Sequence, residues 1–85
     1  MILDERMLRL IGVGASISAN CQPCLQTNLT KALESGAGEQ EIAEAIWVGA
    51  RVRRGAASKM DKFAASINQT VPLPVSLSNN GCECA

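Results

Sequence analysis

The sequence has no histidine among its 85 residues, and this absence removes several kinds of chemistry. Histidine is the usual general base near neutral pH and a frequent ligand of zinc and haem iron. Ser-His-Asp triads, histidine-containing zinc sites and haem ligation through imidazole are therefore excluded. Aromatic residues are also scarce. We expect the two that are present, Trp47 and Phe63, to pack in the core or in a subunit interface.

An excess of charge of one sign is also lacking, because eight basic residues balance eight acidic ones. A net charge of zero gives no support for partners such as nucleic acid or an anionic membrane. No apolar run approaches the roughly 20 residues that span a bilayer. The first ten residues, MILDERMLRL, lack the features of a secretory signal. We therefore expect a cytoplasmic protein whose cysteines act as thiols, ligands or redox catalysts.

The chain also has few large apolar side chains for building a core. Of its hydrophobic residues, twelve are alanine and four are cysteine, which leaves 24 larger side chains. A chain of this length buries only about 60–65% of the surface exposed in its unfolded state. We expect one domain that needs a disulfide, a metal or a partner subunit for stability.

Apolar residues recur at helical spacing in three segments, which predicts an all-α fold of three main helices. The first segment covers residues 3–17. The second follows a predicted N-cap at Asn20 and stops near Gly36. The third covers residues 39–67 and is apolar on more than one side, so we expect the first and third helices to form an oligomer interface.

The composition changes after residue 67, where two prolines and a polar, turn-rich stretch replace the helical pattern. We predict a helical domain at residues 1–67 and an extended arm at residues 68–85. Charge is segregated along the chain, with a net charge of −3 over residues 31–45 and +4 over residues 51–62. These patches are either two solvated helix faces or two halves of a subunit contact.

The strongest local signal is the motif Cys21-Gln22-Pro23-Cys24 at the predicted start of the second helix. This spacing brings two sulfur atoms close enough to form and break a disulfide, and the free amides of the helix end favour the thiolate. The motif therefore predicts redox exchange. Two other interpretations stay open, namely a pair of buried structural cysteines and half of a four-thiolate metal site.

A second pair, Cys82 and Cys84, lies near the end of the sequence on either side of Glu83. A disulfide between cysteines two positions apart closes a small strained ring, which makes it easily reduced and suited to exchange. Redox exchange, metal or metalloid binding, and an incidental occurrence all remain open for this pair. In the metal interpretation the ligands would be Cys21, Cys24, Cys82 and Cys84.

The residues around the first pair carry a wider pattern. A helix leads into Cys21-x-x-Cys24, and it is followed by KALESGA at residues 31–37 and EIAEAI at residues 41–46. Over residues 7–65 this pattern resembles the carboxymuconolactone decarboxylase superfamily and, within it, the AhpD-like alkylhydroperoxidases. The resemblance implies an all-helical fold that assembles as dimers, trimers or hexamers. It also implies a thiol pair that reduces a peroxide or a partner disulfide, with Cys24 attacking and Cys21 resolving. We expect no cofactor.

Two positions depart from the pattern of these alkylhydroperoxidases. The resemblance implies a histidine four residues after the second cysteine and a glutamate about a dozen residues before the first. Here those positions hold Asn28 and Arg9. An amide can form a hydrogen bond with a thiolate or a peroxide, but it cannot accept its proton. We expect Asn28 to lie one turn from Cys24, thiol exchange to persist, and peroxidase turnover by the family's relay to be impaired. The alternatives are a cysteine-based metal or metalloid module and a non-catalytic oligomeric scaffold.

Overall fold

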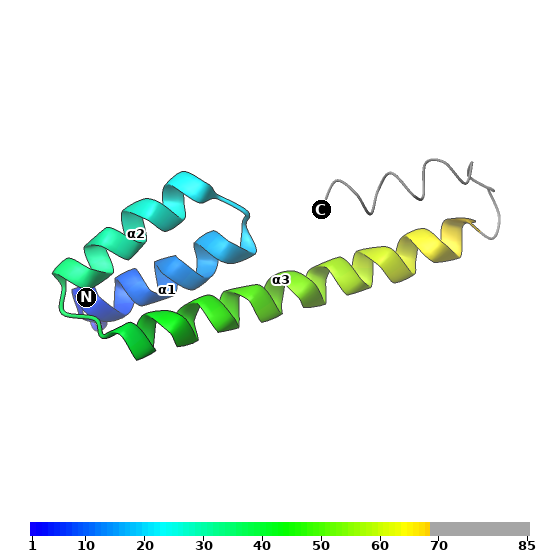
Figure 1. Ribbon diagram of the computed structural model, residues 1–85. Helices are drawn as coiled ribbons and strands as arrows, with labels where there is room; N and C mark the ends of the chain where they lie inside the picture. The colour runs from blue at the N-terminus through cyan, green and yellow to red at the C-terminus, as the bar shows by residue number, and fades with distance from the viewer. Residues whose placement is uncertain (69–85) are drawn as a thin grey trace.

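The computed structural model describes residues 1–68, which form three α-helices (Figure 1). Helix α1 spans Glu5–Ser18, α2 spans Gln22–Glu34 and α3 spans Glu39–Asn68. Both α2 and α3 pack against α1. The all-α prediction is confirmed, and the described residues contain no strand. Helix α3 includes Asn68, while the remainder of the predicted arm, with Cys82 and Cys84, lies outside the described residues.

Local signals account for the ends of α1 and α2. The Asp4 carboxylate caps α1 by accepting a hydrogen bond from the Met7 N–H at 2.8 Å. Helix α2 ends at Glu34, and Gly36 follows with a φ of 91°, a conformation that glycine adopts without steric cost. The Ala37 N–H then donates to the Ala32 carbonyl at 2.9 Å and closes the helix end. The predicted stop near Gly36 is confirmed.

A small core lies between α1, α2 and the first turns of α3. Its buried hydrophobic residues are Leu10, Val13, Ala32, Ala37 and Ile42. Leu25, Leu29 and Ala45 pack against them and are partly buried. Two of the five buried residues are alanine, so little apolar area is removed from water. This agrees with the small core that the composition predicts.

The crossing of α1 and α3 depends on two glycines. The backbones approach so closely at Gly14 and Gly49 that a Cβ at Gly49 would lie 2.9 Å from Ile17 Cβ and 3.0 Å from the Gly14 carbonyl carbon. The Ser18 hydroxyl fixes the crossing by donating to the Gly49 carbonyl at 3.1 Å. Helix α3 therefore packs on α1 through backbone as well as side chains.

Glu41 joins the start of α3 to α1. Its Oε1 accepts a hydrogen bond from the Gly38 N–H at 3.0 Å, and its Oε2 binds the Arg6 guanidinium. The backbone hydrogen bond, followed by the one from Arg6, lowers the pKa of the Glu41 carboxyl. Both contacts favour the ionised form. Their contribution to stability is therefore present at neutral pH and is lost as the carboxyl becomes protonated.

The second half of α3 extends beyond α1 and α2 (Figure 1), and every residue from 51 to 67 is exposed. The exposed apolar side chains here are Val52, Met60, Phe63 and Ile67. Trp47 is 56% exposed and carries the Arg51 guanidinium 4.8 Å from its ring centroid. Neither aromatic residue therefore lies in the core of the described chain. Although α3 has 30 residues, none of the helices described is long and apolar enough to cross a bilayer.

Candidate functional site

The two cysteines of the first motif meet at the start of α2. Cys21 and Cys24 form a disulfide, and their Cα atoms lie 5.3 Å apart. Pro23 lies in the first turn of α2, where a missing backbone N–H leaves no helical hydrogen bond unmade. Cys24 is exposed, whereas Cys21 is half-buried. The structure thus brings the two sulfur atoms together, as their spacing predicts.

The N-cap of α2 is Cys21, so the prediction that Asn20 caps this helix is wrong. Cys21 has the extended backbone that a capping residue needs, and its Sγ accepts a hydrogen bond from the Cys24 N–H at 3.3 Å. Asn20 instead has a φ of 56°, a left-handed conformation that asparagine adopts more readily than most residues. It cannot cap α2 because its backbone makes the turn out of α1.

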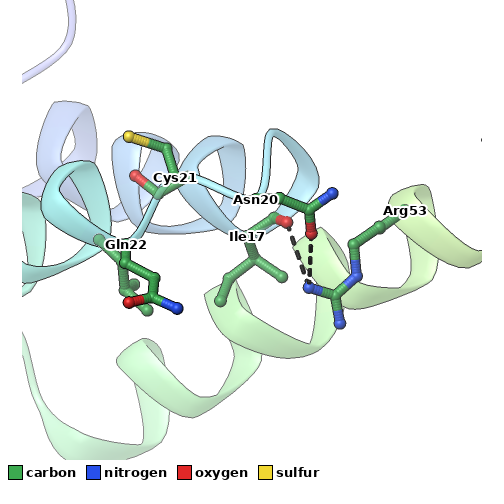
Figure 2. A pocket seen from close by; sticks show the side chains of 7 residues that line it. Ile17, Asn20, Cys21, Gln22 and Arg53 are labelled. Carbon is green, nitrogen blue, oxygen red and sulfur yellow. Dashed lines mark hydrogen bonds between the residues drawn. The ribbon is translucent and has the colours of Figure 1, made fainter. Parts of the chain in front are cut away.

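The turn before Cys21 is held by contacts from both of its neighbours, α1 and α3. The Cys21 N–H donates to the Ser16 carbonyl in α1 at 3.0 Å. From α3, Arg53 Nη1 donates to Asn20 Oδ1 at 3.2 Å and to the Ile17 carbonyl at 3.4 Å (Figure 2). Sequence analysis did not place Arg53 beside the cysteines. Its only signal was membership of the basic cluster in the third helix.

The two positions that depart from the family pattern contact each other. Arg9 Nη1 in α1 donates to Asn28 Oδ1 in α2 at 3.3 Å. Asn28 Nδ2 donates to the Cys24 carbonyl at 3.0 Å and lies 3.4 Å from Ser16 Oγ. Asn28 therefore lies one turn from Cys24, as predicted, but its amide group bonds the backbone of Cys24 rather than its sulfur.

Ser16 links this network to the core. It is the one polar residue buried within residues 1–68, with 4% of its surface exposed. Its hydroxyl donates to the Gly12 carbonyl at 2.6 Å and accepts from Asn28. A sequence signal did exist, because Ser16 follows Val13 by three residues and so lies on the buried face of α1.

The side chains around the disulfide supply positive charge and hydrogen bonds but no base. Arg9 is a fixed cation, and Asn28 and Ser16 are neutral near pH 7. The nearest carboxylate in this network is Glu5, which is exposed and accepts from Arg9 Nε at 2.7 Å. The site is therefore suited to holding an anion such as a thiolate. It is poorly suited to removing a proton from a reactant.

A cavity of about 190 Å³ lies beside Cys21. It is lined by Ser16, Ile17, Asn20, Cys21, Gln22, Leu25 and Arg53 (Figure 2). Ile17 and Leu25 supply apolar walls, and Arg53 is the one charged residue among those described around it. Figure 2 shows the Cys21 sulfur pointing away from Arg53. A ligand in this cavity would therefore contact the turn that carries Cys21 rather than its sulfur.

The four-thiolate metal site depends on residues of which the structure describes only half. Cys21 and Cys24 are paired with each other, and Cys82 and Cys84 lie outside the described residues. Within residues 1–68 no three cysteine, aspartate or glutamate side chains gather into a cluster that could hold a metal ion. The described part of the chain thus supplies at most two of the four sulfur ligands.

Comparison with known proteins decides the family. The profile of the carboxymuconolactone decarboxylase family matches residues 2–66 of the 85. The chain belongs to this family. All three helices of the carboxymuconolactone decarboxylase domain, up to residue 66, lie within the match. The resemblance inferred from the residues around Cys21 and Cys24 is thereby confirmed at the level of the family.

A relative in Paracoccus denitrificans extends this comparison. A protein described as "uncharacterized protein 4 in cox locus" is 40% identical to this chain over 55 residues, which is 65% of this chain and 50% of the relative. The chain therefore spans about half the length of that curated relative. No solved protein structure matches the chain.

Proposed function

We propose that this carboxymuconolactone decarboxylase family member is a thiol–disulfide oxidoreductase that cycles Cys21 and Cys24 between a dithiol and a disulfide. The observation that carries the proposal is the position of the pair. Cys24 is exposed at the start of α2, and the sulfur of Cys21 accepts a helix-end N–H. Such an N–H donor stabilises a thiolate relative to the thiol. A cytoplasmic location, where thiols are kept reduced, fits this chemistry.

In the proposed cycle the exposed Cys24 forms the bond with the substrate. Its thiolate attacks one sulfur of a substrate disulfide and releases the other sulfur as a thiolate. Cys21 then attacks Cys24 Sγ in the mixed disulfide, which forms the Cys21–Cys24 bond and releases the second substrate sulfur. Two electrons pass from the pair to the substrate, and the two protons of the original dithiol pass to the released thiolates.

Disulfides are the preferred substrates in this proposal, because the site lacks a proton relay for peroxides. Cleavage of a peroxide releases an alkoxide or hydroxide, which is a poor leaving group unless a nearby acid protonates it. Asn28 is engaged with Arg9 and with the Cys24 carbonyl, and neither side chain exchanges protons near pH 7. A thiolate leaving group needs no such proton.

We also propose that the active form is a homo-oligomer built on α1 and α3. An apolar groove of about 390 Å³ runs between these helices, and its rim includes the exposed side chains of Met7, Ile11, Val48 and Val52. The acidic stretch at residues 31–45 and the basic stretch at residues 51–62 give one copy a charge pattern complementary to a second copy. A second copy would cover the face that the described chain leaves open.

Thiol accounting combined with metal analysis tests the redox proposal. The Cys82→Ser/Cys84→Ser variant isolates the first pair, and we expect two titratable thiols after reduction and none after mild oxidation. It should also reduce a small-molecule disulfide. We expect Cys21→Ser in this background to accumulate a mixed disulfide at Cys24, because the resolving sulfur is gone. Cys24→Ser is the matched control and should accumulate far less.

Two outcomes would refute the redox proposal. If the fully reduced wild-type chain, with all four cysteines, retains one metal ion per chain and its thiols are protected from titration, the chain is a metal module. If the pair stays oxidised in the presence of a strong dithiol reductant and does not exchange, the chain is a scaffold without chemistry.

A further inference from the structure

We propose that the Cys82-Glu83-Cys84 segment is the dithiol that reduces the Cys21–Cys24 disulfide of the same chain. The inference rests on the proposed function of the first pair and adds its immediate electron donor. Three observations carry it, namely an exposed disulfide at Cys24, an arginine beside that disulfide without a carboxylate partner, and a tail of matching length and charge.

The length of the tail matches the distance it must span. From Asn68 back to Arg53 the path along α3 covers fifteen residues, or about 22 Å at a rise of about 1.5 Å each. The fourteen residues from 69 to 82 reach about 46–50 Å when fully extended. A random coil of this length has a root-mean-square span of about 19–22 Å. Effective concentration is highest when the linker's average span equals the required one.

The charges of the two segments are complementary. Arg53 lines the cavity beside Cys21, and its described hydrogen bonds go to neutral oxygens, the Ile17 carbonyl and Asn20 Oδ1. It has no ion pair with any of residues 1–68. Glu83 lies between the two tail cysteines, so an ion pair between Glu83 and Arg53 would place both tail sulfurs near the start of α2.

The transfer proceeds in two exchange steps that balance electrons and protons. A tail thiolate attacks Cys24 Sγ, the more exposed sulfur, and breaks the Cys21–Cys24 bond. Cys21 leaves as a thiolate that its hydrogen bond from the Cys24 N–H stabilises. The second tail thiolate then attacks the tail sulfur of the mixed disulfide and releases Cys24. The first pair gains two electrons, the tail becomes a disulfide, and the two protons of the tail dithiol pass to Cys21 and Cys24.

Peptide mapping of a trapped intermediate tests this proposal. The Cys21→Ser/Cys82→Ser variant keeps one sulfur from each pair, Cys24 and Cys84, and is equilibrated in glutathione redox buffers. Trypsin then releases residues 10–31 and 63–85 as separate peptides unless a disulfide joins them. We expect the joined peptides, at an effective concentration in the millimolar range. Absence of the joined peptides would overturn the proposal.

Two arginine variants test the recognition step. We expect Arg53→Gln to lower the effective concentration about two- to fivefold, as for the loss of one exposed ion pair. Arg54→Gln removes the same charge one residue away, where the side chain borders a different surface depression, and should change it less than twofold. Equal effects of the two variants would refute the role of Arg53.

Two further measurements separate this proposal from the others. When isotopically labelled and unlabelled chains are unfolded, mixed and refolded, we expect joined peptides with matching labels, and mixed labels would refute transfer within one chain. Exchange of the Cys21–Cys24 pair with an external dithiol, measured in Cys82→Ser/Cys84→Ser, reports the proposed function alone. Exchange there without joined peptides in the trapping variant would leave the proposed function standing and overturn the tail's role.

Discussion

Substituting alanine for Gly49 tests the packing that positions the site, with Gly55→Ala as the matched control. Both glycines lie inside α3, where alanine is ordinarily more stable than glycine by about 0.5–1 kcal/mol. A Cβ at Gly55 would meet nothing within 4 Å. At Gly49 it would meet the backbone of Gly14 and the Cβ of Ile17, neither of which can rotate away.

The expected results therefore have opposite signs. Overpacking of this kind costs about 1–3 kcal/mol, and separating α1 from α3 also weakens the hydrogen bond from Ser18 to the Gly49 carbonyl. We expect a net loss of about 1–3 kcal/mol for Gly49→Ala, which lowers the melting temperature by roughly 5–20 °C in a chain of this size. Gly55→Ala should raise it by a few degrees.

The assay is thermal unfolding followed by far-ultraviolet circular dichroism, with all variants at one protein concentration because association would shift the midpoint. A Gly49→Ala variant that melts at or above the wild-type temperature would show that α1 and α3 do not cross as closely as described. The contact between Arg53 and the turn before Cys21 would then also be in question, because it depends on the same crossing.

Three further predictions concern the relay, the fold and the assembly. Asn28→His should raise peroxide consumption about tenfold, and adding Arg9→Glu to orient the imidazole about tenfold more, near the lower end of general base catalysis; no gain from the double variant in a peroxide assay would refute the relay argument. Glu41→Gln should lower the free energy of unfolding at neutral pH. Because the pKa of Glu41 is lowered in the folded state, its difference from wild type should vanish as the pH falls through that pKa. Urea unfolding at several pH values checks this, and a difference that persists in acid would contradict it. Light scattering should give a multiple of 8.9 kDa for wild type and a smaller species for Val52→Glu, whereas Gln26→Glu on the exposed face of α2 should behave as wild type. A wild-type monomer at micromolar concentration would refute the assembly proposal.

The helices themselves were predictable, because their signals are local. Apolar spacing fixes the faces of α1 and α2, and Gly36 marks the end of α2 through a backbone conformation that other residues rarely adopt. The error at Asn20 has a tertiary cause. Asparagine suits both an N-cap and a left-handed turn, and the sequence does not say which conformation the packing of α1 against α2 selects.

The contacts of the site were less accessible to sequence analysis. The family pattern marked Arg9 and Asn28 separately, but their hydrogen bond joins residues 19 positions apart in different helices. Arg53 contacts Asn20 across 33 positions and belongs to a helix whose other basic residues point to solvent or to Trp47. No local periodicity records such contacts. They follow from the close crossing of α1 and α3, which itself depends on two glycines.

The substitutions around the disulfide are easier to understand together than one at a time. A histidine and a glutamate in contact would hold a proton that a peroxide needs for its leaving oxygen. Arg9 and Asn28 keep a contact between the same two helices and replace that proton with a fixed positive charge. Arg53 adds a second fixed charge from the side of α3. Positive charge near a reactive disulfide favours the approach of thiolates, which are anions, and does little for a neutral peroxide. The same side chains that disfavour peroxide reduction therefore favour exchange with a dithiol, and the acidic C-x-C tail is a dithiol that this chain already carries.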